Sequence, residues 1–177
     1  MISRSRLIRL YFLTAGGTLL WIAAIVAAPY LRSRGLGQAG WFYACFAPLC
    51  HQIPDRSFFL WGFPLAVCAR CFGIYTGFAA GVIAYPFHRG FDAARIPRLK
   101  MFLLVSAPIV LDTGGNFLHL WETGHLLRFL MGFLWGALLP FYFLTGLAEW
   151  PAAGRSSRPA SPGPPGPPHP DQGSRRR

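Results

Sequence analysis

The stretch CHQIPDRSFFLWGFPLAVCARCFGIY, residues 50–75, carries most of the chemistry of this chain. It begins with Cys50 and His51 and ends near a CxxC pair, Cys68 and Cys71, that encloses Arg70. Soft metal ligands and charges reach this density nowhere else in the sequence, and the segments on either side are strongly apolar. We therefore expect these apolar segments to hold residues 50–75 in a membrane.

The composition is that of a membrane protein. The chain is 53% hydrophobic and 13% charged, with a positive mean hydropathy, which lies outside the usual range of soluble globular domains. The net charge of +11 comes from basic residues in the loops and tails between apolar runs. A nucleic-acid-binding protein would cluster such residues on a polar surface, so the pattern argues against nucleic acid as a partner.

Four apolar segments are long enough to cross a hydrocarbon core of roughly 30 Å as helices. They cover residues 7–31, 64–88, 101–121 and 126–150, and Pro64 suits a first helical position. We expect residues 1–150 to form an all-α, integral membrane four-helix bundle. Residues 151–177, rich in Pro, Gly, Ser and Arg, are expected to be a disordered cytoplasmic tail.

The basic residues predict the orientation in the bilayer. One side carries Arg4, Arg6, Arg9, Arg89, Arg95, Arg98, Lys100, Arg155, Arg158, Arg175, Arg176 and Arg177, and the other only Arg32, Arg34, Arg56, Arg70 and Arg128. By the positive-inside rule both termini are cytoplasmic. The loop between the first and second spans is then extracytoplasmic, and we expect it to fold back onto the bundle.

Glycines recur every fourth residue in two of the spans. The second span carries Gly73, Gly77 and Gly81, and the fourth carries Gly132 and Gly136. Small residues on one face let helices approach closely in a membrane, so we expect these two spans to pack together. The same stripes offer a surface for a homo-oligomer.

The cysteines and the adjacent histidine suggest a metal site on the outer side. Cys50, His51, Cys68 and Cys71 match the ligand type and number of tetrahedral zinc. Three thiolates, one neutral imidazole and Zn²⁺ carry a net charge of −1, which Arg56 and Arg70 are placed to balance. The role predicted for such a site is structural or ligand-supporting.

Two other interpretations of the cysteines remain open. In the first, the protein is similar in architecture to quinone-linked disulfide-generating membrane enzymes and to the vitamin K epoxide reductase type, with Cys68 and Cys71 passing electrons to a quinone while Cys45 and Cys50 exchange with a partner. In the second, a disulfide or buried thiols only tie the loop to the bundle. With six acidic residues in the chain, candidates for acid–base catalysis are few, and the sequence leaves enzyme status open.

Charged residues within the spans are expected to pair. Asp112, Asn116 and His119 follow an i, i+4, i+7 spacing and share a helix face, unless Gly114–Gly115 breaks the helix there. Isolated charges at this depth are costly, so an ion pair from Asp112 to Arg70 or Arg128 is predicted. The alternative is that the two arginines and one aspartate form a net positive site for an anionic lipid or small ligand.

The motifs CHQ, PDRSF and CARCFGIYTGF, followed by Asp112 and Arg128, resemble the prokaryotic membrane proteins grouped as domain of unknown function 2085. The resemblance covers roughly residues 40–148. It implies a small multi-pass protein of the prokaryotic cytoplasmic (inner) membrane, in contact with the lipid bilayer, whose activity is not established. It also implies that the motif residues form one site: Cys50, His51, Gln52, Arg56, Ser57, Cys68, Arg70, Cys71, Gly73, Tyr75, Gly77, Asp112 and Arg128.

Overall fold

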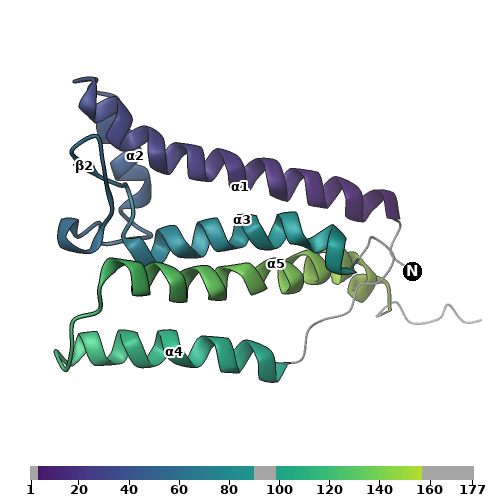
Figure 1. Ribbon diagram of the computed structural model, residues 1–177. Coiled ribbons are helices and arrows are strands. Elements are labelled where there is room, and N and C mark those ends of the chain that lie inside the picture. Colours follow the sequence, from purple (N-terminus) through teal and green to yellow (C-terminus); the bar gives the residue numbers. More distant parts are fainter. Residues whose placement is uncertain (1–3, 90–98, 157–177) are drawn as a thin grey trace, which may run out of the picture.

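The computed structural model describes residues 4–89 and 99–156, and the described part is mostly helical (Figure 1). The elements in chain order are α1 (Arg4–Ser33), α2 (Ala39–Phe46), the 3₁₀ turn η1 (Pro54–Arg56), β1 (Phe59–Leu60), β2 (Phe63–Pro64), α3 (Ala69–Arg89), α4 (Leu99–Phe117) and α5 (His125–Ser156). Of the expected tail, residues 151–156 continue α5, and residues 157–177 lie outside the described residues.

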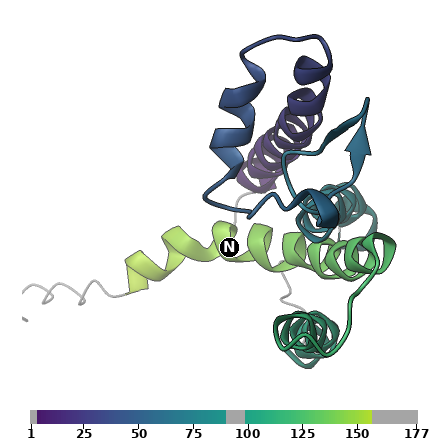
Figure 2. The same cartoon turned by 90° about the vertical axis from the view of Figure 1, so that its left-hand side faces the viewer.

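Four long helices lie side by side in the order α1, α3, α5, α4 (Figure 1). The start of α1, the end of α3 and the start of α4 lie at one end of the molecule. The other end carries α2, the short hairpin and η1, which cover the ends of α1 and α3 (Figures 1 and 2). We call this second end the site end, because residues 50–75 begin there.

Two of the described helices are long and apolar enough to cross a membrane by length and composition, over residues Ser5–Ser33 and His125–Gly146. The helices α3 and α4 have a similar length, with 21 and 19 residues. Polar residues lower their hydropathy, and several of these, including Arg70 and Asp112, lie at the site end. The structure thus supports two of the four expected spans by this test.

The outer surfaces of the long helices suit a lipid environment. Leucine and phenylalanine side chains are exposed along α1, α4 and α5, among them Phe12, Leu20, Leu104 and Leu134. Several serine and threonine hydroxyls donate to a carbonyl of their own helix; Thr18, for example, donates to the carbonyl of Thr14 at 2.7 Å. Such internal satisfaction is what a hydrocarbon surrounding requires of polar groups.

The glycine stripes bring α3 and α5 into backbone contact, as the sequence predicts. A Cβ atom at Gly77 would overlap the carbonyl oxygen of Phe133, and one at Gly132 would overlap the carbonyl oxygen of Arg70. The glycine faces of α3 and α5 therefore pack against each other within one chain. A homo-oligomer through the same stripes stays a prediction, and within one chain these glycines already face a neighbouring helix.

The loop between α1 and α3 folds onto the helix ends around a small core, which includes Ile25, Phe46 and Leu65. Pro64 lies in β2 and not at the start of α3, which corrects the expected helix boundary. The reason is a tight hairpin turn in which Trp61 and Gly62 both have positive φ, of 52° and 79°. The buried residues Leu65, Ala66 and Val67 then lead to Cys68.

The end of α4 differs from the expectation in one respect. The helix runs through Gly114–Gly115 without a break and ends at Phe117. Gly115 instead leaves room for the indole of Trp121, which the following turn folds back against the helix. His119 has a φ of +55° beyond the helix end, so it does not share a helix face with Asp112.

We expect the substitution Gly77→Ala to destabilise the protein, because the added methyl group would separate α3 from the backbone of α5. The expected loss is about 1–3 kcal/mol of unfolding free energy, typical of an overpacked contact. Thermal unfolding in detergent measures it. Gly16→Ala in α1 is the matched control, since a Cβ at that position meets nothing within 4 Å; equal melting temperatures for the two variants would contradict the α3–α5 contact.

Candidate functional site

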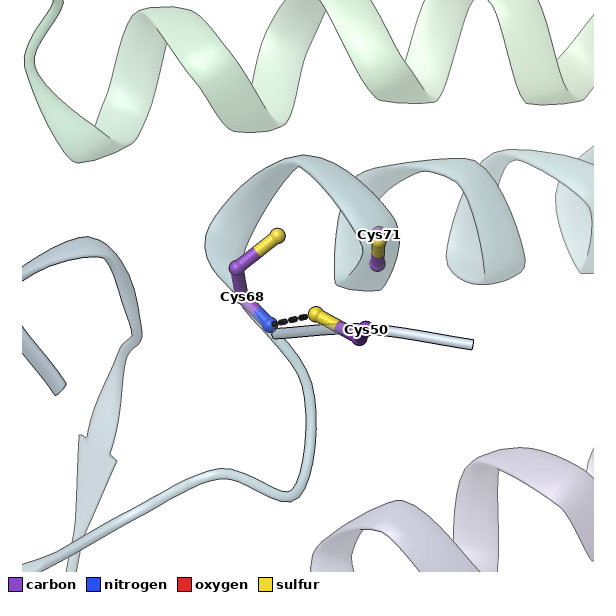
Figure 3. Close-up of side chains that lie close together, drawn as sticks. All are labelled: Cys50, Cys68 and Cys71. Carbon is purple, nitrogen blue, oxygen red and sulfur yellow. Dashed lines mark hydrogen bonds between the residues drawn. The ribbon is translucent and has the colours of Figure 1, made fainter. Parts of the chain in front are cut away.

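Three cysteine sulfurs converge at the site end. The Sγ atoms of Cys50, Cys68 and Cys71 all lie within 4.8 Å of one another, and each thiol is free (Figure 3). Cys50 is only 6% exposed, and the other two are half-buried at the beginning of α3. Residues 18 positions apart along the chain thus share one pocket, as the sequence predicts.

Gln52 places Cys50 over the start of α3. Its backbone has a left-handed conformation, with a φ of 51°, and its side-chain amide donates to the carbonyls of Tyr43 at 2.7 Å and Ala66 at 2.8 Å. These bonds tie the loop after α2 to the segment just before Cys68. Gln52 is therefore a positioning residue for the sulfur cluster.

Cys68 lies one residue before α3, and its carbonyl accepts the amide of Phe72 at 2.9 Å. Its own backbone amide donates to Cys50 Sγ at 3.2 Å (Figure 3). The Cys68 and Cys71 thiols and the backbone amides of Cys68 and Gln52 donate to the same sulfur, so the pKa of Cys50 is well below its ordinary value. The helix N-terminus favours negative charge at this point as well.

Two residues of the sequence-based hypotheses lie outside this sulfur cluster. His51 is exposed and is not among the residues whose ligand atoms lie within 4.8 Å of one another, although it lines the adjoining cavity. Cys45 is exposed on α2 and is not in the cluster either. The cluster that the described residues form is therefore three sulfurs, without the histidine expected as fourth ligand.

A cavity of about 520 Å³ adjoins the cluster. All three sulfur residues line it, as do His51 and Gln52 from the loop. Its remaining lining residues come from the loop, α3, α4, the turn after α4, and α5, and they are Leu49, Ile53, Arg56, Arg70, Thr113, Asn116, Phe117, His119 and Arg128. Eight of the expected site residues thus meet at one cavity.

Asp112 does not line the cavity but contacts two residues that do, Arg70 and Asn116. It is 5% exposed, forms an ion pair with Arg70 across from α3, and accepts a hydrogen bond from Thr123. Asn116 also donates to Asp112 Oδ1, at 3.0 Å. The predicted ion pair within the helices is confirmed, with Arg70 as the partner.

Arg128 lies in the first turn of α5 and is 8% exposed. Its Nη2 donates to Oδ1 of Asn116 at 2.8 Å, and Arg70 Nη1 donates to Thr113 Oγ1 at 2.9 Å. Arg56, which is exposed in η1, and Arg70 both act on Arg128 electrostatically. Three guanidinium groups therefore gather at one cavity.

Two expected site residues face elsewhere. Ser57 is buried, and its hydroxyl donates to the carbonyl of Ile53 at 2.9 Å, which closes η1. The Tyr75 ring packs edge-on against Trp21 of α1, with 5.8 Å between ring centroids, and lines a separate apolar groove. Both support the loop and the helices without reaching the cavity.

No pattern in the sequence predicted a role for Thr123. It reaches Asp112 only because the chain reverses after α4 and Trp121 packs on Gly115, and no spacing along a helix predicts that return. His119 was expected on a helix face; it reaches the cavity from the turn instead. In both cases the position depends on the turn and not on helical periodicity.

Residues 50–142 match the family described as a predicted membrane protein, domain of unknown function 2085, and the chain belongs to this family. An uncharacterized protein of Methanocaldococcus jannaschii is 37% identical over 140 residues, which cover 76% of this chain and 90% of the relative. An uncharacterized protein of Methanothermobacter thermautotrophicus is 32% identical over 88 residues, covering 49% of this chain and 77% of the relative. No solved structure matches the chain.

We expect Asp112→Asn to lower the free energy of unfolding by about 3 kcal/mol, because it leaves the Arg70 guanidinium without a carboxylate in a mostly buried position. Thermal unfolding in detergent measures the loss. Asp55→Asn in the exposed turn η1 makes the same chemical change and serves as the control. A melting temperature for Asp112→Asn equal to that of the control would show that the ion pair does not hold α3 to α4.

Proposed function

We propose that this chain is a four-span protein of the prokaryotic cytoplasmic membrane that binds zinc at its extracytoplasmic face. Cys50, Cys68 and Cys71 supply the ligands, and the site has a structural or ligand-supporting role. The observation that carries the proposal is that three sulfurs converge, not two. A disulfide would use only two of them, whereas a metal ion uses all three.

The spacing of the sulfurs fits a zinc ion. Zinc–sulfur bonds are about 2.3 Å long, so sulfurs at the corners of a tetrahedron around zinc lie roughly 3.8 Å apart. The observed group, within 4.8 Å, needs only a small contraction to reach that geometry. The Cys68 amide that donates to Cys50 Sγ stabilises a thiolate there with or without the metal.

The fourth ligand comes from the cavity side. Three protein ligands with an open fourth position are the arrangement of zinc sites that bind water or substrate. His51 lines the cavity and is exposed, so a movement of its side chain would close the site as the fourth ligand. With a neutral fourth ligand, the three thiolates and Zn²⁺ carry a charge of −1, and the nearby arginines offset it.

The arrangement of the helices supports the proposed orientation. The start of α1, the end of α3 and the start of α4 lie together at the end opposite α2 (Figure 1). The sulfur cluster lies at the start of α3, at the site end. Among the described residues, Arg6, Arg9 and Lys100 lie in the helix starts at this end. The positive-inside rule then places this end in the cytoplasm and the sulfur cluster outside.

A thiol oxidoreductase working with a quinone is the second candidate. A separate groove of about 520 Å³ between α1, α3 and α5 is lined by Trp21, Tyr75 and Phe78, and Tyr75 follows Cys71 by one helical turn. In this reaction the thiols of Cys68 and Cys71 form a disulfide, and their two electrons and two protons reduce the quinone to a quinol. The expected exchange between Cys45 and Cys50 is less well supported, since Cys45 lies outside the cluster.

Metal analysis of the purified full-length protein separates the two candidates. We expect about one equivalent of zinc, which is lost in each of the variants Cys50→Ser, Cys68→Ser and Cys71→Ser because each removes one of three thiolates. Cys45→Ser is the matched control and should retain the metal. Metal-free protein with an oxidised Cys68–Cys71 pair, found by thiol counting, would overturn the zinc site and favour the oxidoreductase.

Labelling of Cys45 tests the orientation. This exposed thiol lies on α2 at the site end, so a membrane-impermeant maleimide should modify it in intact spheroplasts. The variant Cys45→Ser should lose this labelling, which identifies the modified residue. If labelling requires lysed cells, the site end faces the cytoplasm and the proposed topology is wrong.

A further inference from the structure

The cavity beside the sulfur cluster is strongly basic. Arg56, Arg70 and Arg128 line it together with His51 and His119. Among the described residues that line the cavity there is no aspartate or glutamate. Asp112 pairs with Arg70 and does not itself line the cavity.

The charges of the cavity do not balance within the protein. Arg56, Arg70 and Arg128 together with Asp112 carry a net charge of +2, and a charge of −1 at the sulfur cluster still leaves one positive charge in excess. Arg128 is 8% exposed, and the hydrogen bond described for its guanidinium goes to Asn116, a neutral amide. A buried guanidinium has five N–H donors and is costly without an anion, so this arrangement is suited to a negatively charged ligand.

The size and position of the cavity narrow the class of ligand that it can bind. At about 520 Å³ the cavity lies within the range of small-molecule sites and exceeds what a single carboxylate requires. Planar guanidinium forks bind phosphate oxygens in pairs, and the excess positive charge of the cavity suits a phosphate group. The lining residues belong to the site end, which in the proposed four-span arrangement lies at the level of the bilayer phosphates.

We propose that the cavity formed by Arg56, Arg70 and Arg128 binds a phosphate group, either on a phospholipid headgroup or as free phosphate. Arg70 and Arg128 form the fixed part of the site, because α3, α4 and α5 hold them through Asp112, Thr113 and Asn116. Arg56 lies on the exposed turn η1 and completes the site from the loop side. None of its three arginines is a proposed zinc ligand, so phosphate binding can be tested with and without the metal.

Binding is measured on the full-length protein, as purified and after chelation. One arm titrates inorganic phosphate into protein in a neutral detergent and follows the heat of binding. The other arm compares nanodiscs of phosphatidylcholine with nanodiscs containing phosphatidylglycerol, and follows the melting temperature. Saturable phosphate binding identifies a free-phosphate site, whereas stabilisation by phosphatidylglycerol without phosphate binding identifies a headgroup site.

The variant Arg56→Gln removes one arginine from the cavity and leaves the helix contacts in place. In whichever of the two experiments detects binding, we expect this variant to bind about tenfold or more weakly, which is the effect of losing one charge-assisted hydrogen bond. Arg34→Gln is the matched control, because Arg34 is exposed at the same end and does not line the cavity. The second variant, Arg128→Lys, keeps the charge but loses the planar fork, and should weaken binding while retaining a cooperative melting transition.

Three results would overturn the proposal. The first is that neither arm responds. The second is that Arg34→Gln weakens binding as much as Arg56→Gln, which indicates attraction to the basic surface as a whole. The third is full binding by both Arg56→Gln and Arg128→Lys.

Discussion

The backbone contact between α3 and α5 determines where the functional groups lie. Carbonyl oxygens of Arg70 and Ile74 rest against Gly132 and Gly136, where a side chain would not fit. Lipid tails are as apolar as leucine, so helices in a membrane gain little from burying apolar surface and depend on close packing of this kind. The contact begins in the first turn of α3, beside Cys71, and it brings that turn against the turn of α5 that carries Arg128. The sulfur cluster and the arginines adjoin one cavity for this reason.

Arg70 extends this arrangement to α4. Its backbone contacts Gly132 of α5, and its side chain reaches Asp112 and Thr113 on α4. Farther along the helices, α4 is held to α5 by Trp135, which donates to Ser106 at 2.9 Å. Arg70 thus stabilises the helix packing and also lines the cavity, whereas Arg56 lines the cavity from an exposed turn. A substitution at Arg70 would change both the helix packing and the cavity, whereas a substitution at Arg56 changes the cavity alone.

Periodic features of the sequence predicted those parts of the structure that repeat along a helix. The four-residue spacing of glycines predicted the pairing of α3 and α5, and the ligand set predicted that Cys50, Cys68 and Cys71 would meet in one site. The ion pair of Asp112 was predicted from the cost of a charge within a span. Features that depend on a chain reversal were not predicted: the left-handed Gln52 that places Cys50, the return of Thr123 to Asp112, and the exclusion of His51 from the sulfur cluster. Local sequence spacing carries no information about these reversals, because packing between distant segments fixes them.

The proposed metal site and the proposed phosphate site are compatible in their charges. Zinc with three thiolates carries a charge of −1, and the three arginines with Asp112 carry +2. With zinc bound, the cavity therefore keeps a net charge of +1, which attracts an anion in a region of low dielectric constant. Their coupling depends on the fourth zinc position. If His51 occupies it, the phosphate interacts with the metal centre only through charge, and the net −1 of that centre opposes binding. If a phosphate oxygen occupies it, zinc strengthens phosphate binding, and by linkage phosphate strengthens zinc binding by the same factor. The sign of the coupling therefore identifies which group completes the metal site.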